Sequence, residues 1–132
     1  MADIPRTAGP VLIVDDDAAV CEFVEMALSE QGYAVETAIN GDAAVEAAKR
    51  TTPALVLMDL GLPGPNGADL VAKLQRACGT RVPCAVMSGG RPGDDVVASV
   101  DVVGYLAKPF DVDALFALVE RHVCAAQPGV TP

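Results

Sequence analysis

The sequence predicts an α/β fold in which a five-stranded parallel sheet is covered by helices on both faces. Short apolar runs alternate along the chain with stretches whose apolar residues recur at helical spacing. The runs that resemble strands are apolar at consecutive positions, which is typical of strands buried on both faces. Such strand-then-helix units form a doubly wound parallel sheet with right-handed crossovers.

The first half of the chain contains two strand-then-helix units. Residues 11–14 are an apolar run followed by aspartates. One face of a helix follows, formed by Val20, Phe23, Val24, Ala27 and Leu28. Gly32 is expected to end this helix. A second strand is expected over residues 34–39, and Asn40 can cap a second helix that runs to about Arg50.

The second half begins with another apolar run over residues 55–58. Residues 61–67 hold three glycines and two prolines, which predict a loop. A third helix is expected to end at Gly79, and two further strands are expected over residues 84–87 and 104–107.

The fourth helix is expected to be short or weak. Residues 89–93 contain three glycines and a proline, which oppose a helix start. Only residues 94–100 remain for this helix, and they are rich in valine, a residue of modest helix propensity. Asp111 is placed to cap the last helix, and His122 is expected to be a cation in its last turn.

Composition indicates one domain, predicted over residues 1–132 with its core over about 10–124 and a tail or linker start at 125–132. The net charge of −9 disfavours nucleic-acid binding and suits a site for cations. No apolar stretch has the length of a membrane span or of a signal segment, so a cytoplasmic location is expected. No CxxC pair is present, and the cysteines are expected to be reduced; they are Cys21, Cys78, Cys84 and Cys124.

Polar residues follow the predicted strands, and the carboxyl ends of parallel strands meet at one edge of a sheet. These residues are Asp15 and Asp16 after the first strand, Asp59 after the third, Ser88 after the fourth, and Lys108 and Pro109 after the fifth. The strand order 2-1-3-4-5 places the first and third strands side by side and brings the acids together. Clustered carboxylates repel one another, and Mg²⁺ relieves that repulsion. Asp17 is expected to be only a charge at a helix N-terminus.

Four segments resemble, in order and in spacing, the receiver domains of two-component response regulators. The segments are VLIVDDD, LVLMDLGLPGPNG, AVMSGG and GYLAKPF, and the resemblance covers about residues 10–124. It implies a flavodoxin-like receiver fold. It also implies Mg²⁺ as cofactor, and as partners a sensor histidine kinase or histidine phosphotransfer protein and a downstream protein target.

The resemblance also implies roles for single residues. Asp59 matches the phosphorylated aspartate. Asp16 matches the direct Mg²⁺ ligand, and Asp15 the acid that holds the metal through water. Gly61 matches the position whose backbone carbonyl ligates Mg²⁺.

Four further residues match the machinery that responds to the phosphoryl group. Ser88 matches the hydroxyl that bonds the phosphoryl group, and Lys108 the lysine that pairs with one of its oxygens. Pro109 matches the proline of a cis peptide bond, and Tyr105 an aromatic residue that changes rotamer during the switch.

The predicted function is therefore a phospho-accepting signalling switch that assists its own phosphorylation and dephosphorylation, rather than an enzyme with turnover. An aspartate-nucleophile phosphatase needs a second acid two residues after the nucleophile, where this chain has Gly61. A receiver that only binds partners is disfavoured because the acids, Ser88 and Lys108 are all present. Two alternatives stay open: a receiver excised from a larger regulator or hybrid kinase, and a stand-alone phosphate sink. Binding to nucleic acid or membrane is not expected.

Overall fold

The computed structural model describes residues 9–59, 67–79, 82–88 and 102–123. They form one parallel sheet in the order β2-β1-β3-β4-β5, which confirms the predicted fold and strand order. The strands are β1 (Val11–Val14), β2 (Val35–Ala38), β3 (Leu55–Asp59), β4 (Cys84–Ser88) and β5 (Val102–Ala107). The helices are α1 (Ala18–Glu30), α2 (Gly41–Arg50), α3 (Gly67–Cys78) and α5 (Val112–His122).

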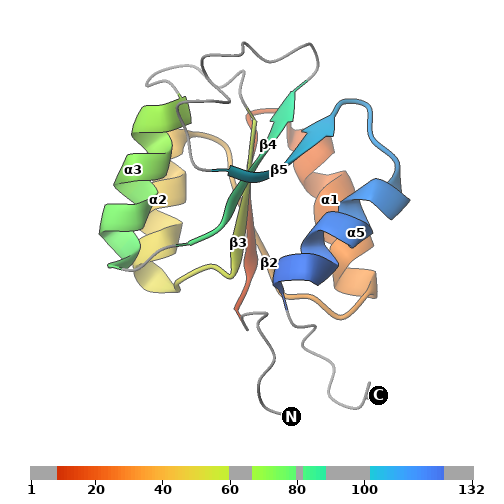
Figure 1. The fold of residues 1–132 in the computed structure, drawn as a ribbon, viewed down its shortest axis with the longest axis horizontal. Helices are drawn as coiled ribbons and strands as arrows, with labels where there is room; N and C mark the ends of the chain where they lie inside the picture. The colour runs from red at the N-terminus through yellow and green to blue at the C-terminus, as the bar shows by residue number, and fades with distance from the viewer. Residues whose placement is uncertain (1–8, 60–66, 80–81, 89–101, 124–132) are drawn as a thin grey trace.

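Helices cover both faces of the sheet, with α1 and α5 on one face and α2 and α3 on the other (Figure 1). The core is accordingly split into two apolar clusters. Val11 and Ile13 of β1 belong to the cluster that includes α1 and α5, whereas Leu12 and Val14 belong to the cluster that includes α2 and α3. Because successive strand residues point to opposite faces, a strand covered on both sides has to be apolar at every position.

Two of the helices are capped at the N-terminus by a side chain that accepts a hydrogen bond from a backbone N–H group, whereas α5 is not. The Asp17 carboxylate accepts a hydrogen bond from the N–H of Ala19 at 3.0 Å, so it caps α1. The Asn40 side chain accepts from the N–H of Ala43 at 2.7 Å and caps α2. Asp111 occupies the N-cap position of α5, but its side chain makes no capping hydrogen bond.

Glycine ends two of the helices. Gly32 follows α1 with φ of 93°, and Gly79 follows α3 with φ of 69°. These are left-handed conformations that residues with a Cβ rarely adopt, which explains why glycine stands at the two predicted helix ends. The start of α3 differs from the prediction: the sequence indicates that Gly67 belongs to the preceding loop, whereas it is the first residue of the helix.

The predicted buried face of α1 is wrong at Phe23, whose exposed fraction is 45%. The helix buries Cys21, Val24 and Leu28 against the sheet instead. Phe23 lies beside this stripe and contacts Phe110, with ring centroids 6.3 Å apart. The stripe of apolar residues that helical spacing predicts is wider than the part of the helix that packs on the sheet. A residue at the edge of that stripe is therefore predicted to be buried although it is exposed.

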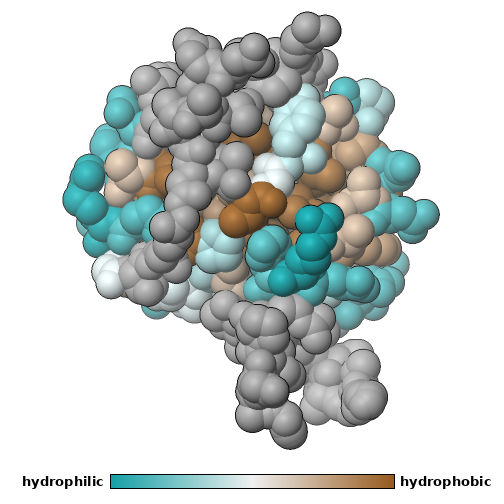
Figure 2. All heavy atoms as spheres, in the orientation of Figure 1, coloured by the Kyte–Doolittle hydropathy of each residue, from teal (hydrophilic) through white to brown (hydrophobic). Residues whose placement is uncertain are grey.

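Strand β5 begins two residues earlier than the sequence suggests. Its register against β4 shifts after the first pair, because Cys84 pairs with Val102 whereas Ala85 pairs with Gly104. This irregularity places Val103 between the two pairs. Val103 and Tyr105 of β5 are 37% and 40% exposed. Figure 2 shows hydrophobic surface near the middle of the face that it draws.

The predictions for the weak fourth helix over 94–100 and for the tail over 125–132 lie outside the described residues. Among the described residues, no helix combines the length and the apolar character that crossing a membrane requires. Three cysteines, Cys21, Cys78 and Cys84, are free thiols. Cys21 and Cys84 are buried, as expected for small apolar side chains.

Candidate functional site

Three carboxylates converge at the carboxyl edge of the sheet. Asp15, Asp16 and Asp59 each offer an oxygen, and these oxygens all lie within 4.8 Å of one another. Their meeting follows from the topology, because β1 and β3 are neighbours whose last paired residues are Val14 and Met58. The acids that come next on the two strands therefore stand side by side.

Lys108 brings a positive charge to these acids from the connection between β5 and α5. Its Nζ atom lies 2.7 Å from Oδ2 of Asp15 and 3.5 Å from Oδ1 of Asp59. The Lys108–Pro109 peptide bond is cis. The Lys108 side chain is only 21% exposed, so much of its stem is covered while its ammonium reaches the carboxylates.

The electrostatic environment keeps the Lys108 ammonium charged. Burial alone would lower the pKa of Lys108, since it penalises the charged form. The hydrogen bond to Asp15 and the charges of Asp15 and Asp59 outweigh that effect and raise the pKa above its usual value. The site therefore contains a fixed cation facing clustered carboxylates at neutral pH.

Asp15 is fully buried and is held on several sides. Its Oδ1 atom accepts a hydrogen bond from the N–H of Asp17 at 2.9 Å, and its backbone N–H donates to the carbonyl of Ala38 at 3.0 Å. The thiol of Cys21 donates to the carbonyl of Asp15 at 3.3 Å. Burial, followed by the charges of Asp15 and Asp17, raises the pKa of Cys21 and keeps the thiol protonated as a donor.

The contact of Cys21 with this site is not predicted from the sequence, where this cysteine is expected only to be a small buried apolar side chain. A usable signal was its position in the first turn of a helix that directly follows the acids. A buried face in that turn has to point at the end of β1.

The donor set fits a hard divalent cation. All three groups are carboxylate oxygens, they lie close enough to share one ion, and no sulfur or imidazole is among them. Asp16 is exposed and Asp59 partly so, which leaves room for water ligands that Mg²⁺ retains. This all-oxygen set is the observation that supports Mg²⁺ at the site.

The structure gives only part of the environment of Ser88 and Tyr105, which are two of the other predicted site residues. Ser88 is the last residue of β4 and pairs in register with Ala107, so its backbone reaches the same edge of the sheet as Lys108. Tyr105 lies in β5 with part of its side chain exposed. Gly61 lies outside the described residues, and the roles of these residues stay predictions.

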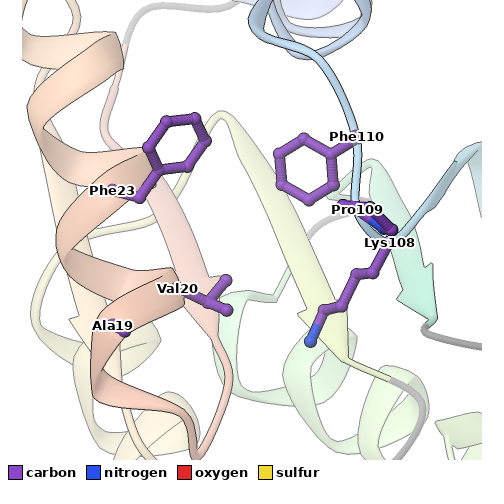
Figure 3. A pocket seen from close by; sticks show the side chains of 6 residues that line it. All are labelled: Ala19, Val20, Phe23, Lys108, Pro109 and Phe110. Atoms are coloured by element: carbon purple, nitrogen blue, oxygen red, sulfur yellow. The ribbon is translucent and has the colours of Figure 1, made fainter.

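An apolar groove adjoins the acid cluster. It lies between α1 and the connection from β5 to α5 and has a volume of about 490 Å³ (Figure 3). Its lining residues are Ala19, Val20, Phe23, Lys108, Pro109 and Phe110. Because Lys108 lines the groove with its stem and contacts the acids with its ammonium, it links the two features.

In a doubly wound sheet ligands bind outside the carboxyl ends of the strands, and at that edge this chain gathers three carboxylates and a lysine. Residues 11–120 match the response regulator receiver domain, and the chain belongs to this family. Receiver domains are regulatory phosphoacceptor domains of two-component systems.

Individual proteins resemble this chain in sequence or in fold. The chain is 34% identical over 92% of its length to the probable transcriptional regulatory protein TcrX of Mycobacterium tuberculosis, and it spans 51% of that protein. The chemotaxis protein CheY4 of Vibrio cholerae shares the fold, with a TM-score of 0.77, 24% identity and coverage of 87% of this chain and 98% of that one.

A response regulator protein from Burkholderia pseudomallei, solved with a phosphorylated aspartic acid, calcium ion and citrate, has a TM-score of 0.73 and 26% identity. That match covers 83% of this chain and 65% of the Burkholderia chain. The chain spans only about half the length of TcrX and of other curated relatives.

Proposed function

We propose that this chain is a signalling switch that accepts a phosphoryl group on Asp59. The observation that carries the proposal is the position of the Asp59 carboxylate, which lies in the acid cluster and 3.5 Å from the Lys108 ammonium. The solved response regulator from Burkholderia pseudomallei carries a phosphorylated aspartic acid, which supports the same chemistry here.

In the proposed reaction an Asp59 oxygen attacks the phosphorus of a phosphohistidine and the phosphorus–nitrogen bond breaks. Asp59 then carries an acyl phosphate, and the donor histidine leaves as an imidazole that takes up a proton from solvent. Water later attacks the phosphorus, which releases phosphate and restores the carboxylate. Asp15, Asp16 and Asp59, with the carbonyl of Gly61, would hold Mg²⁺, which neutralises charge on phosphoryl oxygens when bound. Lys108 would pair with another phosphoryl oxygen.

The proposed response uses residues of β4 and β5. The Ser88 hydroxyl bonds the phosphoryl group, and Tyr105 changes its rotamer as the switch is thrown. Pro109 shapes the connection that presents Lys108. A phosphoryl group adds negative charge and strong acceptors at one point, which is how such a local change is transmitted to a partner surface.

The proposed phosphodonor is a sensor histidine kinase or a histidine phosphotransfer protein in the cytoplasm, where ATP phosphorylates such kinases. The apolar groove beside Lys108 supports a protein donor, since Phe23 and Phe110 in its lining offer apolar surface next to a lysine that contacts Asp59. The output is a contact with a downstream protein, either from a stand-alone domain or from a receiver within a longer regulator.

Acetyl phosphate with Mg²⁺ tests the proposal, using intact-mass spectrometry to count phosphoryl groups. The wild-type chain should gain one group that hydroxylamine removes, and Asp59→Asn should gain none. Asp69→Asn, a substitution of an exposed acid in α3, is the matched control and should be labelled normally. Wild-type protein that takes up no phosphoryl group, or an Asp59→Asn variant that is still fully labelled, would contradict the proposal.

A further inference from the structure

Two cysteines meet at the edge of the sheet where the strands begin, the edge opposite the acid cluster. Cys78 is the last residue of α3, and Cys84 is the first residue of β4. Cys84 is fully buried in the core cluster that includes α2 and α3, and Cys78 packs against the same cluster. The two side chains therefore enter one apolar layer at the same end of that layer.

The side chain of Gln75 fixes how closely α3 and the start of β4 approach each other. Its amide nitrogen donates to the carbonyl of Val82 at 2.7 Å, and its amide oxygen accepts from the N–H of Val82 at 2.6 Å. Cys78 follows Gln75 by three positions, so the two residues are neighbours on the helix surface. The Cys84 thiol donates to the same Val82 carbonyl at 3.6 Å. Gln75 thus holds the segment that carries the Cys84 thiol against the part of α3 that carries Cys78.

The two thiols also influence each other electrostatically, which agrees with their proximity. Burial raises the pKa of Cys78. Burial, and then the charge of Cys78, raises the pKa of Cys84 to about 12. Both groups are therefore protonated at neutral pH, and neither is an activated thiolate. The pair should stay reduced under ordinary conditions and react only on sustained exposure to an oxidant.

The surroundings of the pair define which thiol reacts first and with which partner. Cys78 is partly exposed, so it is the thiol that a small reagent in solvent can reach. Among the described residues the remaining cysteine is Cys21, which belongs to the core cluster on the opposite face of the sheet. Of the described cysteines, only Cys84 shares a core layer with Cys78.

We propose that Cys78 and Cys84 are a modification site at which a peroxide converts two thiols into a disulfide. The small fraction of Cys78 that is thiolate attacks one peroxide oxygen, and the oxygen–oxygen bond breaks to give a sulfenic acid and water. The Cys84 sulfur then attacks the Cys78 sulfur, and the hydroxyl group leaves with the Cys84 thiol proton as a second water. Two sulfurs are oxidised, the peroxide is reduced, and a thiol reductant reverses the change.

The disulfide would join the end of α3 to the start of β4, the strand that ends at Ser88. It closes a loop over residues 78–84, which restricts the unfolded chain and stabilises the folded one. This site lies at the edge of the sheet opposite the acid cluster, and its oxidation does not depend on phosphoryl transfer to Asp59.

Peptide mapping after treatment with hydrogen peroxide tests the proposal, with free thiols alkylated before digestion. Trypsin cleaves after Arg76 and Arg81, so Cys78 and Cys84 fall in separate peptides that only a disulfide can join. The wild-type chain should lose about 2 Da, the mass of two hydrogens, and should yield the joined peptides until dithiothreitol separates them. Cys78→Ser should yield no joined peptides. Cys124→Ser is the matched control and should form the same link as the wild type.

Three results would overturn the proposal. They are a link from Cys78 to Cys124, a link between two chains, and oxidation of Cys78 to a sulfinic acid with Cys84 still free. A loss of two hydrogens that persists in Cys84→Ala would likewise assign the disulfide to other cysteines.

Thermal unfolding tests the effect of the link on the fold. The oxidised wild type should melt roughly 5 °C above the reduced protein, because the link closes a short loop. Cys78→Ser, treated in the same way, should keep its melting temperature. An unchanged or lower melting temperature of fully linked wild-type protein would show that the disulfide strains the fold, and would refute the stabilising link between α3 and β4.

Discussion

Leu118 of α5 fills the space beside Gly104 of β5 where any other residue would place its Cβ. A Cβ built on Gly104 would lie 2.5 Å from Cδ1 of Leu118, which is far inside van der Waals contact. Leu118 is itself buried in the core cluster between α5 and the sheet. The glycine therefore sets how closely α5 approaches β5.

Gly104→Ala should lower the free energy of unfolding by about 1–2 kcal/mol, because the added methyl group overpacks a buried contact. The same substitution should cost less than half as much in a Leu118→Ala background, where the methyl group meets a cavity. Urea denaturation of the four proteins measures both quantities. Equal costs in the two backgrounds would mean that Leu118 is not the obstacle.

Replacing the N-cap residues should distinguish side chains that accept a capping hydrogen bond from one that occupies the N-cap position without making it. Asp17→Ala and Asn40→Ala should each cost about 1 kcal/mol of stability, since each side chain accepts a backbone hydrogen bond. Asp111→Ala is the matched control and should cost clearly less, because its side chain makes no capping bond. Thermal unfolding of the three variants provides the comparison, and a uniform loss in all three would contradict this reading of the caps.

Mg²⁺ should stabilise the folded protein, because it binds carboxylates that are clustered only in the native state. A Mg²⁺ concentration a hundredfold above the dissociation constant adds about 2.7 kcal/mol to the free energy of unfolding. Asp16→Ala should abolish most of the rise in melting temperature. Asp17→Ala should keep that rise, since Asp17 lies outside the cluster. A melting temperature that is the same in EDTA and in Mg²⁺ would rule out this coupling.

His122 should be uncharged at neutral pH, contrary to its expected role as a cation in the last turn of α5. Burial, and then the charge of Arg121, lower its pKa below the usual value. The folded protein therefore favours neutral His122, so its contribution to stability is full above the unfolded-state pKa of about 6.5 and is lost as the pH falls through the lower folded-state value. An NMR titration should give the lowered pKa directly, and His122→Gln should remove this part of the acid dependence of unfolding.

The sequence predicts the three central strands well because β1, β3 and β4 are buried on both faces. A run such as residues 11–14 can then be recognised without knowing which neighbour covers it. The irregular start of β5 escapes the same reasoning, because a register shift beside Val103 depends on how β4 and β5 meet and leaves no mark in a run of valines.

The acid cluster is likewise predictable as a group, since strand ends share one edge of the sheet. The difference between neighbouring Asp15 and Asp16 is not predictable in this way. Asp15 is fully buried and bonded to Lys108, whereas Asp16 is exposed. This difference depends on the turn into α1 and on a lysine 93 positions away along the chain. The roles of Ser88 and Gly61 come from family resemblance alone.

Phe23 occupies a position at which a fluorescent side chain could report changes near Lys108. The chain contains no tryptophan, and Phe23 is half exposed on a groove whose opposite side includes the stem of Lys108 (Figure 3). An indole introduced by Phe23→Trp would be the only strong fluorophore in the molecule. Indole emission responds to nearby charge and to the polarity of its surroundings. A movement of the Lys108 side chain should therefore change the fluorescence of this indole, which can be followed in real time.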